Sequence, residues 1–241
     1  MKIKKREVIL SIVIITIMVI IGLVISDKIN QSLLEQYLEY DTAVQIDTEE
    51  LFRYGMSTNI GNAFVYGDLK AVDTVSFPEI EGKYSYIKKE EQEYRRHTRT
   101  KTEKYKDANG KTRTRTKTET YWSWDTMRTE RKNSKKISFL NVEFEYGKIP
   151  FPPSQYISTV KTGYHKRNVY YGTGIQFKGT IYTTLKNDTI EETPFYENQT
   201  IEETIGRLET GAELVIFWIF WILLTVGVVV GFYYLENKWL D

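Results

Sequence analysis

The chain has 241 residues, of which 33 are basic and 32 acidic, and it contains no cysteine. The absence of cysteine excludes disulfides and thiolate metal sites, and it favours a bacterial surface protein over a small secreted eukaryotic domain. Because the charges nearly cancel, their distribution along the chain carries more information than their sum.

Two apolar runs lie near the two ends of the chain. Residues 8–25 and 214–235 contain no charged side chain, and a helix of roughly 20 apolar residues crosses a bilayer core of about 30 Å. The sequence therefore predicts transmembrane helices at residues 8–26 and 214–235, with one domain at residues 27–213 between them. The competing interpretation makes residues 1–26 a cleaved signal peptide. The long apolar run without proline favours an uncleaved anchor.

Charged and aromatic residues indicate the orientation of the two spans. Four basic residues precede the first span: Lys2, Lys4, Lys5 and Arg6. Basic residues beside a span favour the cytoplasmic side, so we expect residues 1–7 and 236–241 in the cytoplasm and the domain outside the cell. Aromatic residues mark the expected outer and inner boundaries of the second span: Trp218 and Trp221, then Tyr233, Tyr234 and Trp239. The prediction is a multi-pass protein of the cell membrane.

Helices are predicted at both junctions between the spans and the domain. Four apolar residues share one helical face after the first span: Leu33, Leu34, Tyr37 and Leu38. We expect this amphipathic helix to continue the span and to pack on its own domain. Asp47 and Glu50 resemble a capping box, which would start a short helix. Thr200 and Glu203 form a second box, which predicts a helix through Leu208.

Alternation of apolar and polar residues predicts strands in the rest of the domain. Residues 175–185 alternate in the pattern of a half-buried strand. A second alternation covers residues 140–146, but Ile137 and Phe139 are out of phase with it, which predicts one strand with a bulge near Phe139. Pro150 ends this strand. The predicted fold class is mainly β, of the α+β type, as an extracytoplasmic domain between two transmembrane α-helices.

Residues 92–124 predict a long, protruding basic β-hairpin. Threonine recurs at every second position on both sides of Asn109-Gly110, a dipeptide that favours tight turns between strands. A three-residue loop with a left-handed Gly110 sets threonines opposite threonines, whereas a two-residue turn sets each threonine opposite a charge. The first register pairs Thr98 with Thr120, Thr100 with Thr118 and Thr102 with Thr116. Because matching cross-strand pairs contribute roughly 0.2–1 kcal/mol each, we expect this register, although it also sets Lys101 opposite Lys117.

The hairpin has no apolar face between Thr98 and Thr120, so it should project roughly 30 Å or more from the core. Its cations are the candidate contacts for an anionic ligand: Arg95, Arg96, Arg99, Lys101, Lys104, Lys111, Arg113, Arg115 and Lys117. Outside a cell, such a hairpin suits wall polymer, lipid headgroups or an acidic protein surface, and the compartment argues against nucleic acid. Two other interpretations stay open: charges that only prevent edge pairing, and binding to the acidic residues 187–213 of a second copy.

The sequence carries no pattern of a catalytic, cofactor-binding or metal site. The two histidines, His97 and His165, lack a second ligand at metal spacing, and we expect His97 to be solvated. No dinucleotide, Walker or nucleophile-elbow motif is present. Gly227 and Gly231 are the candidate helix-packing residues, because small residues four apart allow close approach. These glycines could pack against the second span of another copy or against the first span of the same chain beside Gly22.

The order of the strands resembles a pattern found in two groups of membrane proteins. Residues 99–102 read R-T-K-T, residues 113–124 read R-T-R-T-K-T-E-T-Y-W-S-W, and residues 139–144 read F-L-N-V-E-F. This is similar to Luma-type transmembrane proteins and to the GIDE domain between the two membrane spans of a mitochondrial ubiquitin ligase. The resemblance covers less than a quarter of the chain, which lacks the ligase's RING and the Luma family's extra C-terminal spans, so no functional residue is carried over. More broadly, the chain resembles uncharacterised two-pass membrane proteins of Gram-positive bacteria and their prophages.

Together these patterns predict a non-enzymatic, prophage-encoded two-pass membrane protein that displays a β-rich interaction domain outside the cell. One alternative is an envelope-ligand binder whose basic hairpin contacts anionic wall polymer or lipid headgroups. Another is an accessory subunit of a membrane enzyme, which would need a polar cleft with perturbed acids. The expected partners are the lipid bilayer, a second copy through Gly227 and Gly231, and an anionic envelope polymer or acidic protein. No cofactor is expected.

Overall fold

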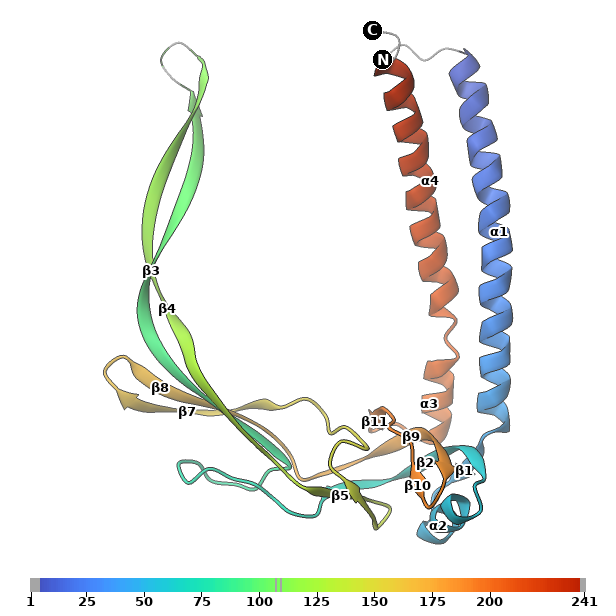
Figure 1. Ribbon diagram of the computed structural model, residues 1–241, viewed down its shortest axis with the longest axis vertical. Coiled ribbons are helices and arrows are strands. Elements are labelled where there is room, and N and C mark those ends of the chain that lie inside the picture. The colour runs from blue at the N-terminus through green and yellow to red at the C-terminus, as the bar shows by residue number, and fades with distance from the viewer. Residues whose placement is uncertain (1–4, 107, 109, 239–241) are drawn as a thin grey trace. The chain divides into compact units, whose positions relative to one another are not determined.

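The computed structural model describes residues 5–106, 108 and 110–238 (Figure 1). Some residues used in the sequence predictions lie outside the described residues: Lys2, Lys4, Asn109 and Trp239. The chain forms two compact units. One combines the terminal segments, up to residue 44 and from residue 201 onward, and the other is Gln45–Thr200.

The terminal unit contains three helices: α1 (Lys5–Thr42), α3 (Ile201–Leu208) and α4 (Ala212–Lys238). α1 is unbroken, which confirms that the helix after the first span continues it, and its 38 residues extend about 57 Å. The predicted apolar face is narrower than expected. Leu33 is buried, whereas Leu34 and Leu38 are exposed because they lie about 100° and 140° further round the helix. α3 begins directly after Thr200 and ends at Leu208, as predicted.

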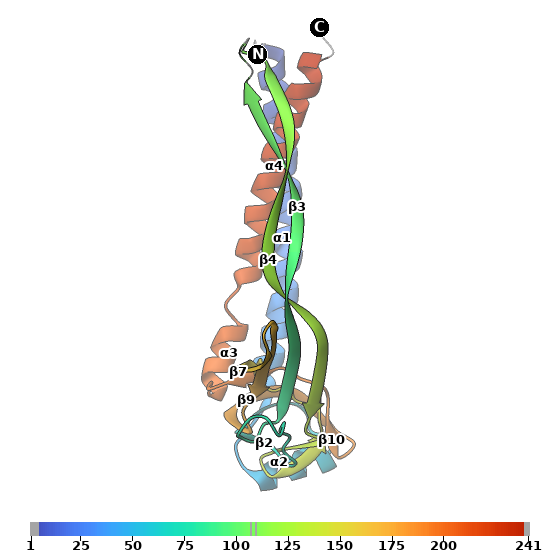
Figure 2. The ribbon, with the colours of Figure 1, turned by 90° about the vertical axis from the view of Figure 1, so that its left-hand side faces the viewer.

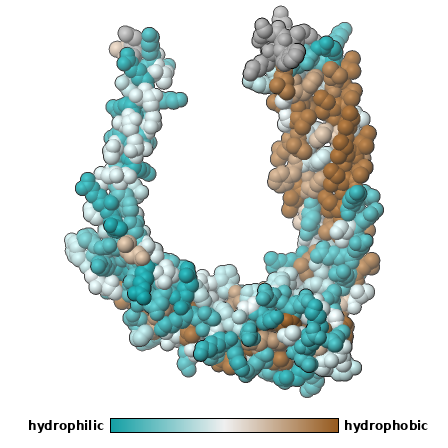
Figure 3. All heavy atoms as spheres, in the orientation of Figure 1, coloured by the Kyte–Doolittle hydropathy of each residue, from teal (hydrophilic) through white to brown (hydrophobic). Residues whose placement is uncertain are grey.

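The long helices expose apolar side chains along their length, shown as brown surface in Figure 3. Two helical segments, Lys5–Thr42 and Ile201–Glu236, are long and apolar enough to cross a membrane. Apolar helices with exposed side chains suit the hydrocarbon of a bilayer better than water. The structure is therefore consistent with a two-pass membrane protein.

Tryptophans of α4 hold the two long helices together. The indole nitrogen of Trp221 donates to the Met18 carbonyl oxygen at 2.8 Å, and that of Trp218 donates to Ser26 Oγ at 3.2 Å. Gly22 makes this approach possible, because a Cβ atom there would lie only 2.5 Å from Trp221 Nε1. These tryptophans, predicted as membrane-boundary residues, thus satisfy their N–H groups within the helix pair.

The two glycines predicted to pack helices do not contact the first span. Among the described residues, no atom outside the adjacent turns of α4 lies within 4 Å of a Cβ atom built at Gly227 or Gly231. The close approach of α1 and α4 occurs at Gly22 instead, because the Trp221 ring needs the space that a side chain would fill. The face of α4 that carries Gly227 and Gly231 is therefore left open in this chain.

The second unit contains a seven-stranded antiparallel sheet in the order β10-β9-β2-β5-β6, with β1 paired to β2 and β11 paired to β9. Its elements are β1 (Val44–Ile46), α2 (Glu49–Ser57), β2 (Gly61–Ala71), β5 (Lys136–Phe139), β6 (Val142–Glu145), β9 (Gln176–Lys186), β10 (Thr189–Ile190) and β11 (Phe195–Glu197). Phe52 of α2 is fully buried in the main core, with its ring centroid 6.0 Å from those of Phe139 and Phe144. The strand predicted over residues 175–185 is confirmed as β9, which buries Ile181 and Leu185.

The predicted cap of α2 is shifted by one residue. Thr48, and not Asp47, is the N-cap, and its hydroxyl oxygen accepts a hydrogen bond from the backbone nitrogen of Leu51 at 3.5 Å. The capping side chain must reach the third residue of the helix, and the helix starts at Glu49. The capping box proposed for Asp47 and Glu50 is therefore wrong.

The strand predicted to bulge near Phe139 is instead a tight hairpin of β5 and β6. Leu140 and Asn141 both have a left-handed backbone, with φ of 46° and 60°, and Phe139 pairs with Val142 across the turn. Two left-handed residues match the twist of a two-residue hairpin. The chain therefore reverses, and the two out-of-phase apolar runs reach the same core. A Cβ atom at Gly67 would lie 2.5 Å from Leu140, so the glycine leaves room for this turn.

The other sheet has four antiparallel strands in the order β4-β3-β8-β7. Its strands are β3 (Tyr86–Lys106), β4 (Thr112–Asn133), β7 (Gln155–Gly163) and β8 (Lys166–Thr173). The predicted register is confirmed, with Thr98 opposite Thr120 and Lys101 opposite Lys117, and Gly110 has a φ of 73°. The hairpin is longer than the predicted 92–124, because both strands continue as part of this sheet. A small second core contains Phe77, Ile87 and Tyr170.

Asp73 stabilises the corner where β4 leads into β5. Its carboxylate accepts hydrogen bonds from the backbone nitrogens of Lys135 at 2.8 Å and Lys136 at 2.9 Å, and from Ser134 Oγ at 2.8 Å. These donors, above all the two backbone amides, favour the ionised form and lower the pKa of Asp73 to about 2. One ionised side chain thus hydrogen-bonds to three consecutive residues of the segment that connects the two sheets.

Candidate functional site

The outer part of the β3–β4 hairpin is a two-stranded arm without a core. β8 pairs with β3 only as far as Glu93. We call residues 94–106 and 112–124 the hairpin arm; among the described residues its two strands pair with each other, apart from one backbone hydrogen bond from Tyr94 to His165. None of the described side chains in the arm is buried. At about 3.3 Å per residue its strands extend about 40 Å, in agreement with the predicted projection. The two strands coil around each other along this arm (Figure 2).

The arm presents two chemically different faces. Side chains alternate between the faces along each strand, and directly opposed residues share a face. One face, the threonine face, carries Tyr94, Arg96, Thr98, Thr100, Thr102, Lys104, Lys106, Thr112, Thr114, Thr116, Thr118, Thr120, Trp122 and Trp124. The other, the charged face, carries Arg95, His97, Arg99, Lys101, Glu103, Tyr105, Arg113, Arg115, Lys117, Glu119, Tyr121 and Ser123. Among the described residues of the arm, both acidic side chains lie on the charged face.

Two ion pairs flank a pair of opposed lysines on the charged face. Arg99 contacts Glu119 at 2.8 Å, and Arg115 contacts Glu103 at 3.2 Å. The hydrogen bond from Arg99 is the main cause of the lowered pKa of Glu119, and the charges of Lys101 and Lys117 lower it further.

Lys101 and Lys117 sit directly opposite each other between these pairs. Within the described part of the chain, neither lysine belongs to an ion pair. Like charges in opposed positions are destabilising, so this position on the arm favours the approach of an anion.

His97 is held at the base of the charged face. Its Nε2 atom lies 2.8 Å from Asp125, and its ring stacks on Tyr121 with centroids 5.3 Å apart. Asp125 also accepts a hydrogen bond from Ser123 Oγ at 3.2 Å. The expectation that His97 is simply solvated is therefore wrong, because its cross-strand neighbours provide both a carboxylate and an aromatic surface.

The predicted anionic-ligand contacts do not form one cluster. Six lie on the charged face: Arg95, Arg99, Lys101, Arg113, Arg115 and Lys117. Arg96 and Lys104 lie on the threonine face, and Lys111 lies in the connection between the strands. The prediction also omitted Lys106, near the outer end of the threonine face, and Trp122 and Trp124, near its base. The signal in the sequence was that each of these residues lies an even number of positions from the threonines of its own strand, which places it on the same face.

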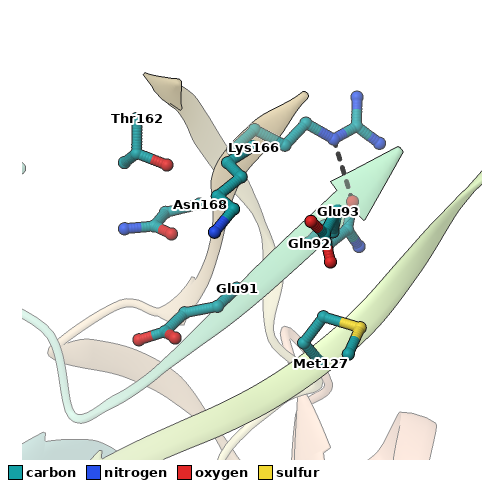
Figure 4. Close-up of a pocket in the computed structure, with 8 residues that line it drawn as sticks. Glu91, Gln92, Glu93, Met127, Thr162, Lys166 and Asn168 are labelled. Atoms are coloured by element: carbon teal, nitrogen blue, oxygen red, sulfur yellow. Dashed lines mark hydrogen bonds between the residues drawn. The ribbon is translucent and has the colours of Figure 1, made fainter. Parts of the chain in front are cut away.

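A shallow pocket of about 310 Å³ lies beside the base of the arm (Figure 4). Its lining combines residues of the four strands β3, β4, β7 and β8: Glu91, Gln92, Glu93, Met127, Thr162, Lys166, Arg167 and Asn168. Within it, Arg167 Nε donates to Gln92 Oε1 at 2.9 Å, the dashed line in Figure 4. Among the described residues, no group of three or more histidine, aspartate or glutamate side chains is placed to hold a metal ion. The pocket offers mixed charges and hydrogen-bonding groups, which suit polar binding more than a particular reaction.

Comparisons of the chain with known protein families, with curated proteins and with solved structures found no match. Two helices are long and apolar enough to cross a membrane, and an α+β unit of two antiparallel sheets carries one long basic hairpin.

Proposed function

We propose that this chain is a two-pass bacterial membrane protein, of the kind encoded by prophages, that displays its β-rich unit outside the cell. Its hairpin arm binds an anionic polymer of the cell envelope. The observation that carries this proposal is the opposed pair Lys101 and Lys117, which form no ion pair with any described residue and lie between two ion pairs.

Electrostatics supports an anionic ligand at this position. Lys101 and Lys117 repel each other in the free protein, and a bound phosphate or carboxylate removes that repulsion while it gains two attractive contacts. The flanking Arg99 and Arg115 already have acidic partners, so the net attraction is centred on the lysine pair. Because these side chains are exposed, the attraction should weaken as salt screens it.

The charge pattern around the spans supports the outward orientation. Lys5 and Arg6 precede the first apolar run, and residues 187–213 before the second run are acidic. The positive-inside tendency then places both termini in the cytoplasm and the domain on the opposite side. An exposed cationic arm outside a bacterium meets the phosphate- and carboxylate-bearing polymers of the wall.

The proposal is tested with the full chain in nanodiscs of neutral lipid. Polyphosphate is the probe, because it has the repeated negative charge of a wall polymer and no sugar ring. Binding is measured by calorimetry at low and high salt. We expect Lys101→Gln with Lys117→Gln to weaken binding about tenfold, which corresponds to about 1.4 kcal/mol, and to reduce the dependence on salt.

The matched control removes two lysines elsewhere in the same unit. Lys83 and Lys135 are exposed and lie outside the arm, so Lys83→Gln with Lys135→Gln changes the net charge equally. We expect this control to bind polyphosphate as the unaltered chain does. Equal losses in both double variants would show that only net charge matters and would contradict a site on the arm.

A further inference from the structure

An aromatic patch lies where the threonine face of the arm meets the four-stranded sheet. We define the aromatic patch as Tyr94, Trp122, Trp124 and His165. Trp124 is opposite Tyr94 on β4, and the backbone nitrogen of Tyr94 donates to the His165 carbonyl oxygen at 2.9 Å. Three chain segments therefore place aromatic rings in one row on the same face, with Trp122 diagonal to that row.

Three of these rings form one cluster of nearly parallel rings. Ring centroids are 5.4 Å apart for Tyr94 and Trp122, 6.1 Å for Trp122 and His165, and 6.0 Å for Tyr94 and His165. The angles between their planes are only 20° to 27°. In a column of stacked rings the outer two would be about twice as far apart as neighbours. Three nearly equal separations instead mean that the rings lie around a common centre.

The patch is ordered by its neighbours and still open to solvent. The guanidinium of Arg167 lies 4.0 Å from the centroid of the Trp124 ring, and the same side chain donates to Gln92. Trp122 keeps 50% of its surface exposed and Trp124 keeps 36%. Large aromatic side chains contribute most to binding when they are buried by a partner, so an ordered and exposed group of this kind indicates a binding surface.

The polar groups around the patch define the chemistry of its ligand. Arg96 is directly opposite Trp122, and the next cross-strand pair is Thr98 with Thr120. From Gln92 to Lys106 and from Thr112 to Thr126, the described residues on this face include no carboxylate. This stretch therefore combines flat apolar rings with hydroxyl groups and cations. The Glu90 carboxylate borders it, where it accepts hydrogen bonds from Gln92 at 3.1 Å and Thr126 at 3.5 Å.

We infer that the aromatic patch binds the sugar rings of a glycan, and that the polymer contacted by the arm is an acidic glycan of the cell envelope. The inference rests on the proposed function for the acidic part of that ligand. A pyranose ring presents a flat face of C–H groups, which packs on an aromatic ring, and a rim of hydroxyl groups. The threonine hydroxyls bind that rim, and Arg96 binds a carboxylate or phosphate on the same chain.

Peptidoglycan strands stripped of phosphate polymers are the first probe for the full chain in nanodiscs. Binding is followed by tryptophan fluorescence and calorimetry. We expect Trp122→Ala to weaken strand binding about tenfold or more, and Trp122→Phe to restore part of it because a ring remains. Tyr156→Ala is the matched control, since Tyr156 is an exposed aromatic residue on β7 of the same sheet. Near-UV circular dichroism verifies that each variant stays folded.

A second probe, polyphosphate, separates this inference from the proposed function. Polyphosphate carries charge without sugar rings, so its binding should depend on Lys101 and Lys117 and be unaffected by Trp122→Ala. If polyphosphate binds but the strands do not, the sugar inference is wrong and the proposed function stands. If the strands bind but polyphosphate does not, the lysine site is wrong and the sugar inference stands.

Single-stranded oligodeoxythymidylate tests the competing ligand class, because nucleic-acid bases also stack on aromatic rings. We expect it to bind more weakly than the strands and to lose little affinity in Trp122→Ala. Tighter binding than the strands, with a loss of about tenfold in Trp122→Ala, would overturn the glycan inference in favour of a nucleic acid.

Discussion

Removal of the Asp73 carboxylate should destabilise the unit that carries the hairpin. The carboxylate accepts hydrogen bonds from Ser134 and from the backbone nitrogens of Lys135 and Lys136. Its pKa falls from 3.8 to about 2 in the folded protein, and each unit corresponds to about 1.4 kcal/mol. Because Asp73 is partly exposed, solvent screening reduces the expected effect to about 1–2 kcal/mol.

The same shift determines how stability should depend on pH. The folded-state pKa of Asp73 is below its ordinary value, so the unfolded chain binds the proton more tightly. This contribution is therefore complete above about pH 4 and is lost as the pH falls toward about 2. In Asp73→Asn this part of the pH dependence should be missing.

The assay is urea unfolding of the full chain in detergent micelles at pH 7 and at low pH, followed by tryptophan fluorescence. We expect Asp73→Asn to lower the free energy of unfolding by about 1–2 kcal/mol at pH 7 and by less near pH 2. The control is Asp68→Asn, because the Asp68 carboxylate makes an exposed ion pair with Lys70 at 3.3 Å and accepts one long hydrogen bond from Gln176 at 3.5 Å, and an exposed ion pair contributes about 0–1 kcal/mol. Equal losses for the two variants at pH 7 would refute the reasoning.

Three further predictions concern the helices, the arm and the core. Gly22→Leu should separate α1 from α4, because Trp221 occupies the space beside Gly22, whereas Gly227→Leu should leave the two helices together. Energy transfer between dyes on the two helices measures their separation, and an equal loss of energy transfer in both variants would contradict the packing at Gly22. Lys101→Glu should stabilise the unit by about 0.2–1 kcal/mol, because it removes a like-charge pair, and it should also weaken polyphosphate binding. Urea unfolding measures the expected gain in stability and calorimetry measures the expected loss of affinity in the same variant. Phe52→Ala should cost about 3–5 kcal/mol in unfolding experiments, because the ring is fully buried, and a loss below about 1 kcal/mol would contradict the assigned core.

The hairpin register could be predicted because several features of the sequence agree on it. One register alone sets threonine opposite threonine and Arg99 opposite Glu119, and the structure has that register. Gly110 adds a residue that accepts the left-handed backbone of the turn. Local pattern was sufficient here because both strands are consecutive in the chain and neither depends on a distant core.

Other features depend on contacts that local pattern does not report. The turn at Leu140 and Asn141 lacks glycine, so its left-handed backbone was not evident, and a change of phase was interpreted as a bulge. Trp218 and Trp221 suited a membrane boundary by position, but their hydrogen-bond partners lie on α1 at the other end of the chain.

The candidate site likewise has a part that local sequence pattern predicts and a part that depends on contacts between distant segments. Alternation predicted which cations belong to the arm, and with the register it also assigns them to two faces. The aromatic patch needs His165, which reaches Tyr94 only because β8 pairs with β3. That pairing joins segments far apart in the sequence, and no local pattern predicts it.

The most direct test of the account is to determine on which side of the membrane the hairpin arm lies in living bacteria. The chain has no cysteine, so Thr118→Cys, on the exposed threonine face, provides a single site for a membrane-impermeant maleimide. Lys5→Cys, at the start of α1, is the matched control for the opposite side. The account predicts that intact cells label Thr118→Cys and that Lys5→Cys is labelled only after permeabilisation. Labelling of Thr118→Cys only after permeabilisation would place the arm in the cytoplasm and contradict its role in binding an envelope polymer.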